Sequence, residues 1–489
     1  MTTTTEGSGP EAPTTARRSG HPATSEVEGP VRATRPVPGR PVLVVAACVA
    51  LAVASLPLPA ALGYDPWAWL VWGREVARLS LDTTGGPSWK PLPVLVTTLV
   101  APAGTAAPAL WLVVARTAGL LALAGAARVA WRLAGPWAGA LAAGFLVLTP
   151  DVEARFLRLV GEGHSAPLTA ALVLWAWDRH LAGHHRTALL LGALLALDRP
   201  EAWPLLLAYG AWLGWREPRA RPLLALVAVA LPVLWFGADW WGSGRFLHGA
   251  EVAQVDAQDT DRLPTALSRA GESVTLVAWA GAAVCVALAL RARDRALLAV
   301  AAGAVVWFAV VVAMSAVLGY AAIGRFHLPA AAVVCVLAAV GVVRGVRVVP
   351  AGRARRVVAA LAAVVVVAGL VGRAAGLPEL ASDVRARAAV EADLDRALGD
   401  AGGPEALAGT CGRVVIDDPT IPRVAVAWKL DLPLHEVGTI RTPVAGPATA
   451  VVRTDGRVGR AYAAGPDGVV ERARNARWAV YAVGCGDGA

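Results

Sequence analysis

Long apolar runs separated by short charged clusters are the main pattern of this chain. Many runs approach the 18–22 residues, roughly, that a helix needs to cross about 30 Å of hydrocarbon. Inside hydrocarbon a segment must satisfy its own backbone polar groups, so such runs of Ala, Leu and Val must be helices. The pattern predicts about eleven membrane-spanning helices, several of them short, near residues 41–62, 107–131, 136–149, 160–178, 187–198, 202–215, 222–241, 271–290, 296–318, 327–343 and 357–375.

Arginines gather in every second loop between these runs, which indicates the orientation of the chain. The basic loops contain Arg128 and Arg132; Arg179 and Arg186; Arg216, Arg219 and Arg221; Arg291, Arg293 and Arg295; and Arg344, Arg347, Arg353, Arg355 and Arg356. Because basic loops remain in the cytoplasm, the N-terminus is expected there. The other loops are then extracytoplasmic: residues 63–106, 150–159, 198–201, 242–270, 319–326 and the tail from about 376.

Composition supports a multi-pass protein of the plasma membrane. The 489 residues are 56% hydrophobic, with a mean hydropathy of +0.55, which is too apolar for a soluble protein of this size. The net charge of +9 is typical of nucleic-acid binding, but here the charges fall in short loops between spans. That placement follows the positive-inside rule, so no nucleic-acid partner is expected.

Two terminal regions differ from the apolar part at 41–375. Residues 1–40, rich in Thr, Pro, Gly and Ser, predict a disordered cytoplasmic tail. Residues 376–489 predict a small extracytoplasmic α/β domain with strands at 414–416 and 478–483. Cys411 and Cys485 bracket that domain in an oxidising compartment, so a disulfide between them is expected.

The first external loop holds the most informative chemistry. It contains GYDPWAWLVWGRE at 63–75 and GGPSWKPLP at 85–93. A carboxylate at the membrane surface, such as Asp65, can act as a general base on an acceptor hydroxyl. Lys90, one of only two lysines in the chain, can pair with a phosphate and stabilise it as a leaving group.

These motifs resemble the GT-C superfamily of integral membrane glycosyltransferases. Within the superfamily they are most similar to the bacterial protein O-mannosyltransferases and the aminoarabinose-transferase-like members. The resemblance rests on Asp65 after the first span, EVAR at 75–78 and WKPLP at 89–93. In WKPLP, Leu92 replaces the second Pro of a Lys-Pro-Pro-Leu-like element. DRPE at 198–201 and GRFHLP at 324–329 resemble further family elements. The resemblance covers about 41–375 and implies a GT-C-like membrane fold.

The resemblance also implies a site and a reaction. Asp65 is then the general base, Lys90 and Arg325 bind the donor phosphate, and the donor is a polyprenyl-phosphate-linked sugar. Further candidates for substrate binding are Trp67, Trp69, Trp89, Glu75, Asp151, Glu153 and Arg199. Asp151 and Glu153 are also candidate ligands of a divalent cation such as Mg or Mn, although no spacing in the sequence requires a cofactor.

Each candidate has a structural alternative. Asp65 can cap the helix that leaves the membrane, and the tryptophans can form an interfacial belt. Lys90 can anchor an interfacial helix, and Arg325 can pair with a lipid headgroup. Asp198, Arg199 and Glu201 are interpreted first as an internal salt-bridge cluster, with ligand binding as the alternative. His164, on an apolar face, is interpreted as a structural histidine.

The leading hypothesis is a glycosyltransferase that moves a sugar, with inversion, to an extracytoplasmic glycan, lipid or protein of the cell envelope. The loops assigned to the cytoplasm are too short for a nucleotide-sugar domain, which fits a lipid-linked donor in the bilayer. The alternative is a transporter or flippase for a lipid-linked precursor, which predicts midplane charges and inverted repeats. A scaffold protein is the third hypothesis.

Overall fold

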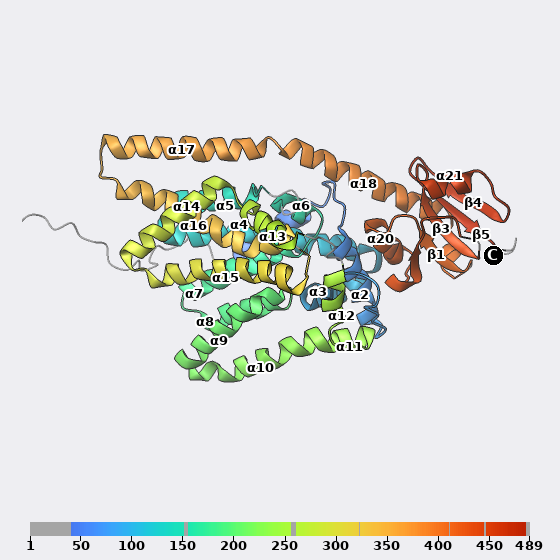
Figure 1. Ribbon diagram of the computed structural model, residues 1–489, viewed down its shortest axis with the longest axis horizontal. Helices are drawn as coiled ribbons and strands as arrows, with labels where there is room; N and C mark the ends of the chain where they lie inside the picture. Colours follow the sequence, from blue (N-terminus) through green and yellow to red (C-terminus); the bar gives the residue numbers. More distant parts are fainter. Residues whose placement is uncertain are drawn as a thin grey trace, which may run out of the picture.

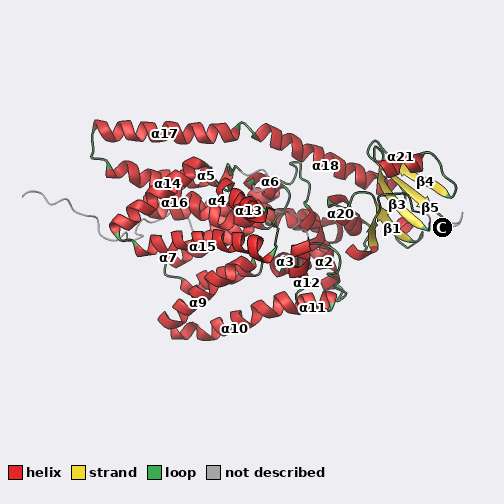
Figure 2. Ribbon diagram, viewed as in Figure 1, coloured by secondary structure: helices red, strands yellow, loops and turns green. Residues whose placement is uncertain are grey.

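The structure is a computed structural model that describes residues 41–150, 155–255, 261–321, 323–409, 411–444 and 446–485. The predicted tail at 1–40 lies outside these residues, as do Asp151 and Glu153. The described chain is mostly helical, with one small sheet near its C-terminal end, as Figures 1 and 2 show.

Most helices of the apolar region follow the predicted runs, whereas two short ones, at 248–255 and 262–272, lie mostly in the predicted external loop at 242–270. The helices are α1 (Pro41–Ala54), α4 (Ala107–Ala134), α5 (Pro136–Val147), α6 (Phe156–Gly161), α7 (Ala166–Leu181), α8 (His185–Ala196), α9 (Trp203–Arg216), α10 (Arg221–Pro232), α11 (Ala238–Ser243), α12 (His248–Val255), α13 (Arg262–Glu272), α14 (Leu276–Ala292), α15 (Arg295–Leu318), α16 (Leu328–Val348) and α17 (Arg353–Ala374). By length and composition, five helical stretches of the described chain can cross a membrane, or six if the bent pair α13–α14 counts as one. The apolar helices are confirmed, and the number of eleven spans stays a prediction.

Helix α16 forms the centre of the bundle. Fourteen of its residues, from Leu328 to Gly341, are buried, and α4, α5, α7, α14 and α15 pack around it. Gly341 faces α14 so closely that a Cβ there would lie 1.9 Å from the carbonyl oxygen of Gly281. Small residues at such a crossing let two backbones approach, which is a main source of helix association in a membrane.

One predicted span is interrupted, and another begins at a sharp bend. The run expected at 160–178 is split into α6 and α7 by residues 162–165, where Gly163 has a φ of 70°. Helices α13 and α14 meet at a bend of 80°. Hydropathy records only apolar content, so it revealed neither feature. The break between α6 and α7 places the polar side chains of 162–165 inside the protein.

The first loop is itself helical. It contains α2 (Tyr64–Ala77) and α3 (Pro91–Val100), which pack against each other between the bundle and the C-terminal sheet (Figure 1). Pro91 opens α3 and Pro66 lies in the first turn of α2, at positions where a missing N–H costs nothing.

The C-terminal region begins with α18 (Leu377–Asp400), which follows α17 after a short break (Figure 1). Its five strands have the order β2-β1-β3-β5-β4, with β1 parallel to β2 and β3, and β5 antiparallel to β3 and β4. The elements are α19 (Gly403–Leu407), β1 (Arg413–Ile416), α20 (Ile421–Lys429), β2 (Val437–Thr439), β3 (Ala448–Arg453), α21 (Arg457–Ala463), β4 (Val469–Arg474) and β5 (Trp478–Val483). The expected disulfide between Cys411 and Cys485 is confirmed.

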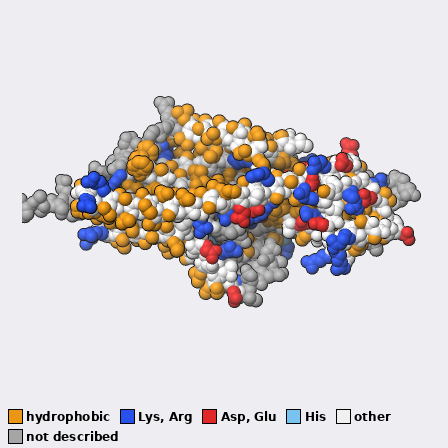
Figure 3. All heavy atoms as spheres, turned by 90° about the horizontal axis from the view of Figure 1, so that it is seen from above, with side chains coloured by type: hydrophobic (Ala, Val, Ile, Leu, Met, Phe, Trp, Pro, Cys, Tyr) orange, Lys and Arg blue, Asp and Glu red, His pale blue; other side chains and the backbone are white. Residues whose placement is uncertain are grey.

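The surface divides along the long axis of the molecule. In Figure 3 hydrophobic side chains cover the helical part, whereas acidic and basic side chains mix over the end that holds the sheet. A further group of basic side chains lies at the opposite end of the molecule. A wide apolar band between two charged ends is typical of a protein that crosses a bilayer.

Candidate functional site

Asp65 lies in the first turn of α2, in a buried position. Asp65 is 6% exposed. The N-cap of α2 is Gly63, so Asp65 does not cap this helix. A carboxylate in the first turn is favoured by the partial positive charge of the helix N-terminus.

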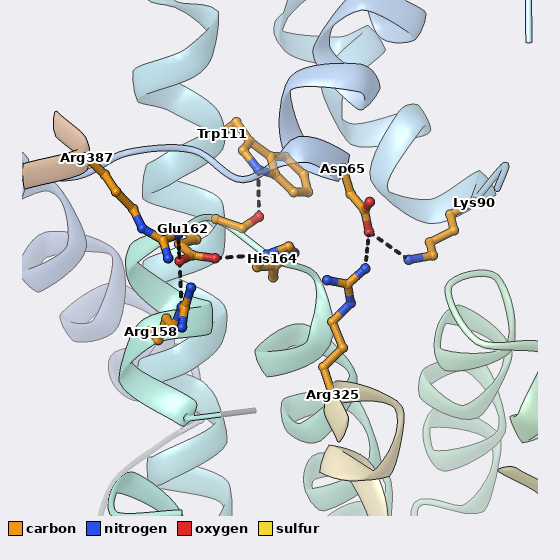
Figure 4. A network of polar contacts seen from close by, with 9 residues as sticks. Asp65, Lys90, Trp111, Arg158, Glu162, His164, Arg325 and Arg387 are labelled. Carbon is orange, nitrogen blue, oxygen red and sulfur yellow. Dashed lines mark hydrogen bonds and ion pairs between the residues drawn. The ribbon is translucent and has the colours of Figure 1, made fainter. Parts of the chain in front are cut away.

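Two cations hold the Asp65 carboxylate (Figure 4). Lys90, the residue before α3, places Nζ 3.4 Å from Oδ2 of Asp65. Arg325 donates to the same oxygen at 3.0 Å from the 3-10 turn η5 (Gly324–His327), 260 residues further along the chain. The structure thus brings together the three residues to which the sequence assigned the base and the phosphate contacts.

The charges around Asp65 keep it ionised. Burial by itself raises the pKa of this carboxyl. The positive charges of Arg325 and Lys90 lower the pKa by more than burial raises it, with smaller contributions from His164 and Arg199. The net result is a pKa well below the usual range. Burial lowers the pKa of Lys90, and the Asp65 carboxylate opposes that change.

A second polar network lies beside the first, in the break between α6 and α7. Glu162 accepts hydrogen bonds from Arg158 at 2.8 Å and from Arg387 of α18, and it pairs with His164 at 3.2 Å (Figure 4). Burial lowers the pKa of His164, and its hydrogen bond with Glu162 opposes that change. The Gly63 N–H donates to the carbonyl oxygen of Glu162 at 2.9 Å. This network therefore fixes the residue that starts α2 and links it to α18.

The turn between α8 and α9 brings Arg199 to the same region. The N–H of Leu92 donates to the carbonyl oxygen of Leu197 at 3.0 Å, which ties this turn to α3. The Arg199 guanidinium lies 4.6 Å from the centre of the Phe326 ring, beside Arg325. Arg199 thus packs against η5, whose Arg325 holds Asp65.

The candidate tryptophans are buried rather than exposed at a bilayer surface. Trp69 lies under Nζ of Lys90 at 5.2 Å, at the edge of the Asp65 site. Trp67 lies instead under Lys429 of α20, at 4.9 Å. Trp89 donates to the carbonyl oxygen of Leu234 and packs on the bundle. Of the three, Trp69 lies directly against a residue of the site.

Glu75 lies at the opposite end of α2 from Asp65. One carboxylate oxygen accepts from the N–H of Asp82 at 3.0 Å, and burial raises the pKa of Glu75 to about 7.

The C-terminal region grips this end of α2. Arg74 donates to the carbonyl oxygens of Trp428 and Leu432, at 3.2 and 2.8 Å, and pairs with Asp431 at 2.7 Å. Sequence reasoning missed these contacts, because they join residues more than 350 positions apart.

A large apolar cavity lies beneath the charged site. It has a volume of about 510 Å³ and runs between α7, α8, α9, α15 and α16. Ala202 and Pro329 line one end, next to the turn that holds Arg199 and to η5. His180 and Asp294 line the other end. An apolar space that ends next to the elements holding Arg199 and Arg325 suits a ligand with a hydrocarbon tail and an anionic head.

Within the described residues no group of three His, Cys, Asp or Glu side chains is placed to hold a metal ion. The candidate ligands Asp151 and Glu153 lie outside those residues.

Comparison with solved structures identifies the architecture. The crystal structure of ArnT from Cupriavidus metallidurans bound to undecaprenyl phosphate matches with a TM-score of 0.55 and 16% identity, over 90% of this chain and 97% of that one. The apo state of the same protein matches with a TM-score of 0.53 and 17% identity, over the same shares of the two chains. The chain has the ArnT fold.

This likeness shows that the expected multi-helix membrane architecture is shared with ArnT over most of both chains. With the apolar helices it shows that the chain is a polytopic membrane protein. No family model and no curated protein matches the sequence.

Proposed function

We propose that this protein is a glycosyltransferase that moves a sugar from a polyprenyl-phosphate donor to an acceptor outside the cytoplasm. The observation that carries the proposal is the triad of Asp65, Lys90 and the partly exposed Arg325, together with an apolar cavity that ends next to η5, the turn that holds Arg325. A carboxylate and two cations can act as a base and a phosphate clamp, and the cavity suits an isoprenoid chain. ArnT, whose fold this chain shares, is bound to undecaprenyl phosphate in its crystal structure.

The reaction is a single displacement. The acceptor hydroxyl oxygen attacks the anomeric carbon while Asp65 takes its proton. The bond between that carbon and the phosphate oxygen breaks, and the electron pair leaves with the polyprenyl phosphate. Lys90 and Arg325 stabilise the charge that develops on the leaving phosphate. Because the acceptor attacks opposite the leaving group, the anomeric configuration is inverted.

Donor binding and base strength are coupled in this arrangement. Without donor, Arg325 and Lys90 hold the pKa of Asp65 well below its usual range, which makes it a weak base. When the donor phosphate pairs with the same two cations, their charge is shared and the pKa of Asp65 rises. Asp65 thus becomes an effective base only when a donor is present.

The positive-inside rule, applied to the arginine-rich loops, supports a cytoplasmic N-terminus, with the triad and the C-terminal sheet on the other side of the membrane. The acceptor is then a glycan, lipid or protein of the cell envelope. We infer that the C-terminal region braces α2 through the contacts of Arg74.

The test is transfer of labelled sugar from polyprenyl-phosphate donors in membranes that contain wild-type protein or Asp65→Asn. Asn keeps the size of Asp but cannot take a proton, so the rate is expected to fall about 10²–10⁴-fold. Glu405→Gln, an exposed change far from the triad, is the matched control. Equal rates for Asp65→Asn and wild type would remove Asp65 as the base. Movement of intact lipid-linked sugar across the membrane without transfer would favour a transporter.

A further inference from the structure

The turn between α8 and α9 holds three ionisable side chains away from water. Asp198, Arg199 and Glu201 are 0%, 2% and 4% exposed. The turn is tied to α3 through Leu197, directly beside Lys90, and Arg199 lies on Phe326, directly beside Arg325. Both cations assigned to the donor phosphate therefore have this turn as a neighbour.

These side chains do not satisfy one another. Neither carboxylate oxygen of Asp198 accepts a hydrogen bond from the described residues, and the same holds for Oε2 of Glu201. Nε of Arg199 is likewise without an acceptor, and it lies 4.0 Å from Asp198, beyond hydrogen-bond distance. The internal salt-bridge cluster expected from the sequence is therefore only weakly formed.

Another buried aspartate shows what a satisfied cluster looks like in this protein. Asp178, also 0% exposed, accepts from Arg128 at 3.0 Å and from Arg132 at 2.6 Å. A buried carboxylate without such partners is costly, so it persists mainly where a ligand completes it. Burial raises the pKa of Glu201, which reflects the same lack of partners.

The missing partners must be hydrogen-bond donors, because a carboxylate can only accept. With the donor phosphate held by Lys90 and Arg325, the group attached to that phosphate is the sugar, and its hydroxyl groups are donors. We propose that Asp198 and Glu201 accept hydrogen bonds from hydroxyl groups of the transferred sugar, so that the site selects a neutral sugar over an acidic one. This inference rests on the function proposed above.

Selection follows from charge as well as from hydrogen bonding. A sugar carboxylate in this position would face two like charges and would leave their lone pairs unmatched. Specificity of this kind arises as much from repulsion of the wrong ligand as from attraction of the right one.

The experiment measures binding of lipids to the purified full-length protein. The probes are undecaprenyl phosphate, the same lipid carrying each of a panel of neutral hexoses and pentoses, and the lipid carrying a uronic acid. The proteins are wild type, Asp198→Asn, Glu201→Gln, the double variant and the exposed control Glu405→Gln. Asn and Gln keep the shape of the side chains and remove their charge.

In wild type, at least one neutral-sugar lipid is expected to bind about tenfold more tightly than the bare phosphate, as for a hydrogen bond to a charged group. The double variant is expected to lose most of that advantage and to bind bare undecaprenyl phosphate as well as wild type does, or better. The uronic acid lipid should bind more weakly than the neutral ones in wild type, and this gap should narrow in the double variant.

Four results would overturn the inference. Equal loss of bare and sugar-bearing lipids in the variants would show that the turn only supports the two cations. If the double variant still binds the sugar-bearing lipids more tightly than the bare lipid, as wild type does, the two carboxylates do not recognise the sugar. The same conclusion follows if wild type binds the bare lipid as tightly as every sugar-bearing lipid. Neither result would contradict the proposed function. Failure of wild type to bind any of the lipids would instead refute the proposed function as well.

Discussion

The Glu162 network gives the sharpest stability prediction, because it joins the start of α2 to α18. Its carboxylate is buried, and the arginines on either side of it are partly exposed. Burial tends to raise its pKa, but hydrogen bonds from His164 and Arg158 outweigh burial and lower the pKa of Glu162 from 4.5 to about 2. Replacing this residue by Gln should remove that stabilisation.

The magnitude follows from the shift. At about 1.4 kcal/mol per pKa unit, a lowering from 4.5 to about 2 corresponds to about 3 kcal/mol of stability near neutral pH. Because water screens the partly exposed arginines, we expect Glu162→Gln to lower the free energy of unfolding by about 1–2 kcal/mol.

The direction of the pH dependence is fixed by the sign of the shift. A carboxylate whose pKa is lowered by folding stabilises the protein fully above pH 4.5, and this stabilisation is lost as the pH falls to about 2. The apparent unfolding temperature of Glu162→Gln should therefore lie about 1–4 °C below that of wild type near neutral pH, and the gap should shrink on acidification.

The assay is thermal unfolding of the purified protein in detergent, followed by tryptophan fluorescence at a series of pH values. Glu379→Gln, an exposed change on α18, is the matched control. A gap between Glu162→Gln and wild type that is as large in acid as at neutral pH would refute the reasoning, because ionised Glu162 would then not be its source.

Three further predictions concern stability and the brace on α2. Asp178→Ala should destabilise the helical bundle by about 3–5 kcal/mol, because it leaves neighbouring arginines without a buried partner, and this is measured as a loss of folded protein after mild heating. Cys411→Ser should cost about 2–4 kcal/mol, since the Cys411–Cys485 disulfide joins residues 74 positions apart; thermal unfolding of reduced wild type should match the variant. Lys429 lies over Trp67 of α2 and pairs with Asp395. Lys429→Ala should therefore increase cleavage of the C-terminal region by added protease and reduce the rate of sugar transfer. Lys429→Arg should keep the protease resistance and the transfer rate of wild type.

Each of these has a result that would contradict it. Wild-type stability of Asp178→Ala would show that the arginines find water or lipid phosphate instead. Equal unfolding of oxidised and reduced wild type would show that the disulfide does not limit unfolding. Unchanged proteolysis of Lys429→Ala would show that the contacts of Arg74 and Arg78 hold α2 to the C-terminal region without Lys429.

The sequence by itself determined where most helices form and which loop carries the candidate base. Hydrocarbon leaves a long apolar segment no structure other than a helix, so composition and run length were enough to find the helical segments. The disulfide was also predictable, because two cysteines flanked one small region. Asp65 and Lys90 could be paired in advance, since they lie only 25 positions apart in one loop.

Only the tertiary structure decided which distant residues complete the site. The contact of Arg325 with Asp65 depends on how η5 packs against α2, and hydropathy contains no information about that packing. The same is true of Arg387, whose helix reaches back to Glu162. Sequence reasoning interpreted His164 as a structural histidine, and only the break between α6 and α7 shows that its partner is Glu162 and that it lies beside Asp65. Apolar patterning specifies segments because solvent transfer is a local property, but an ion pair between distant residues exists only after those segments have packed.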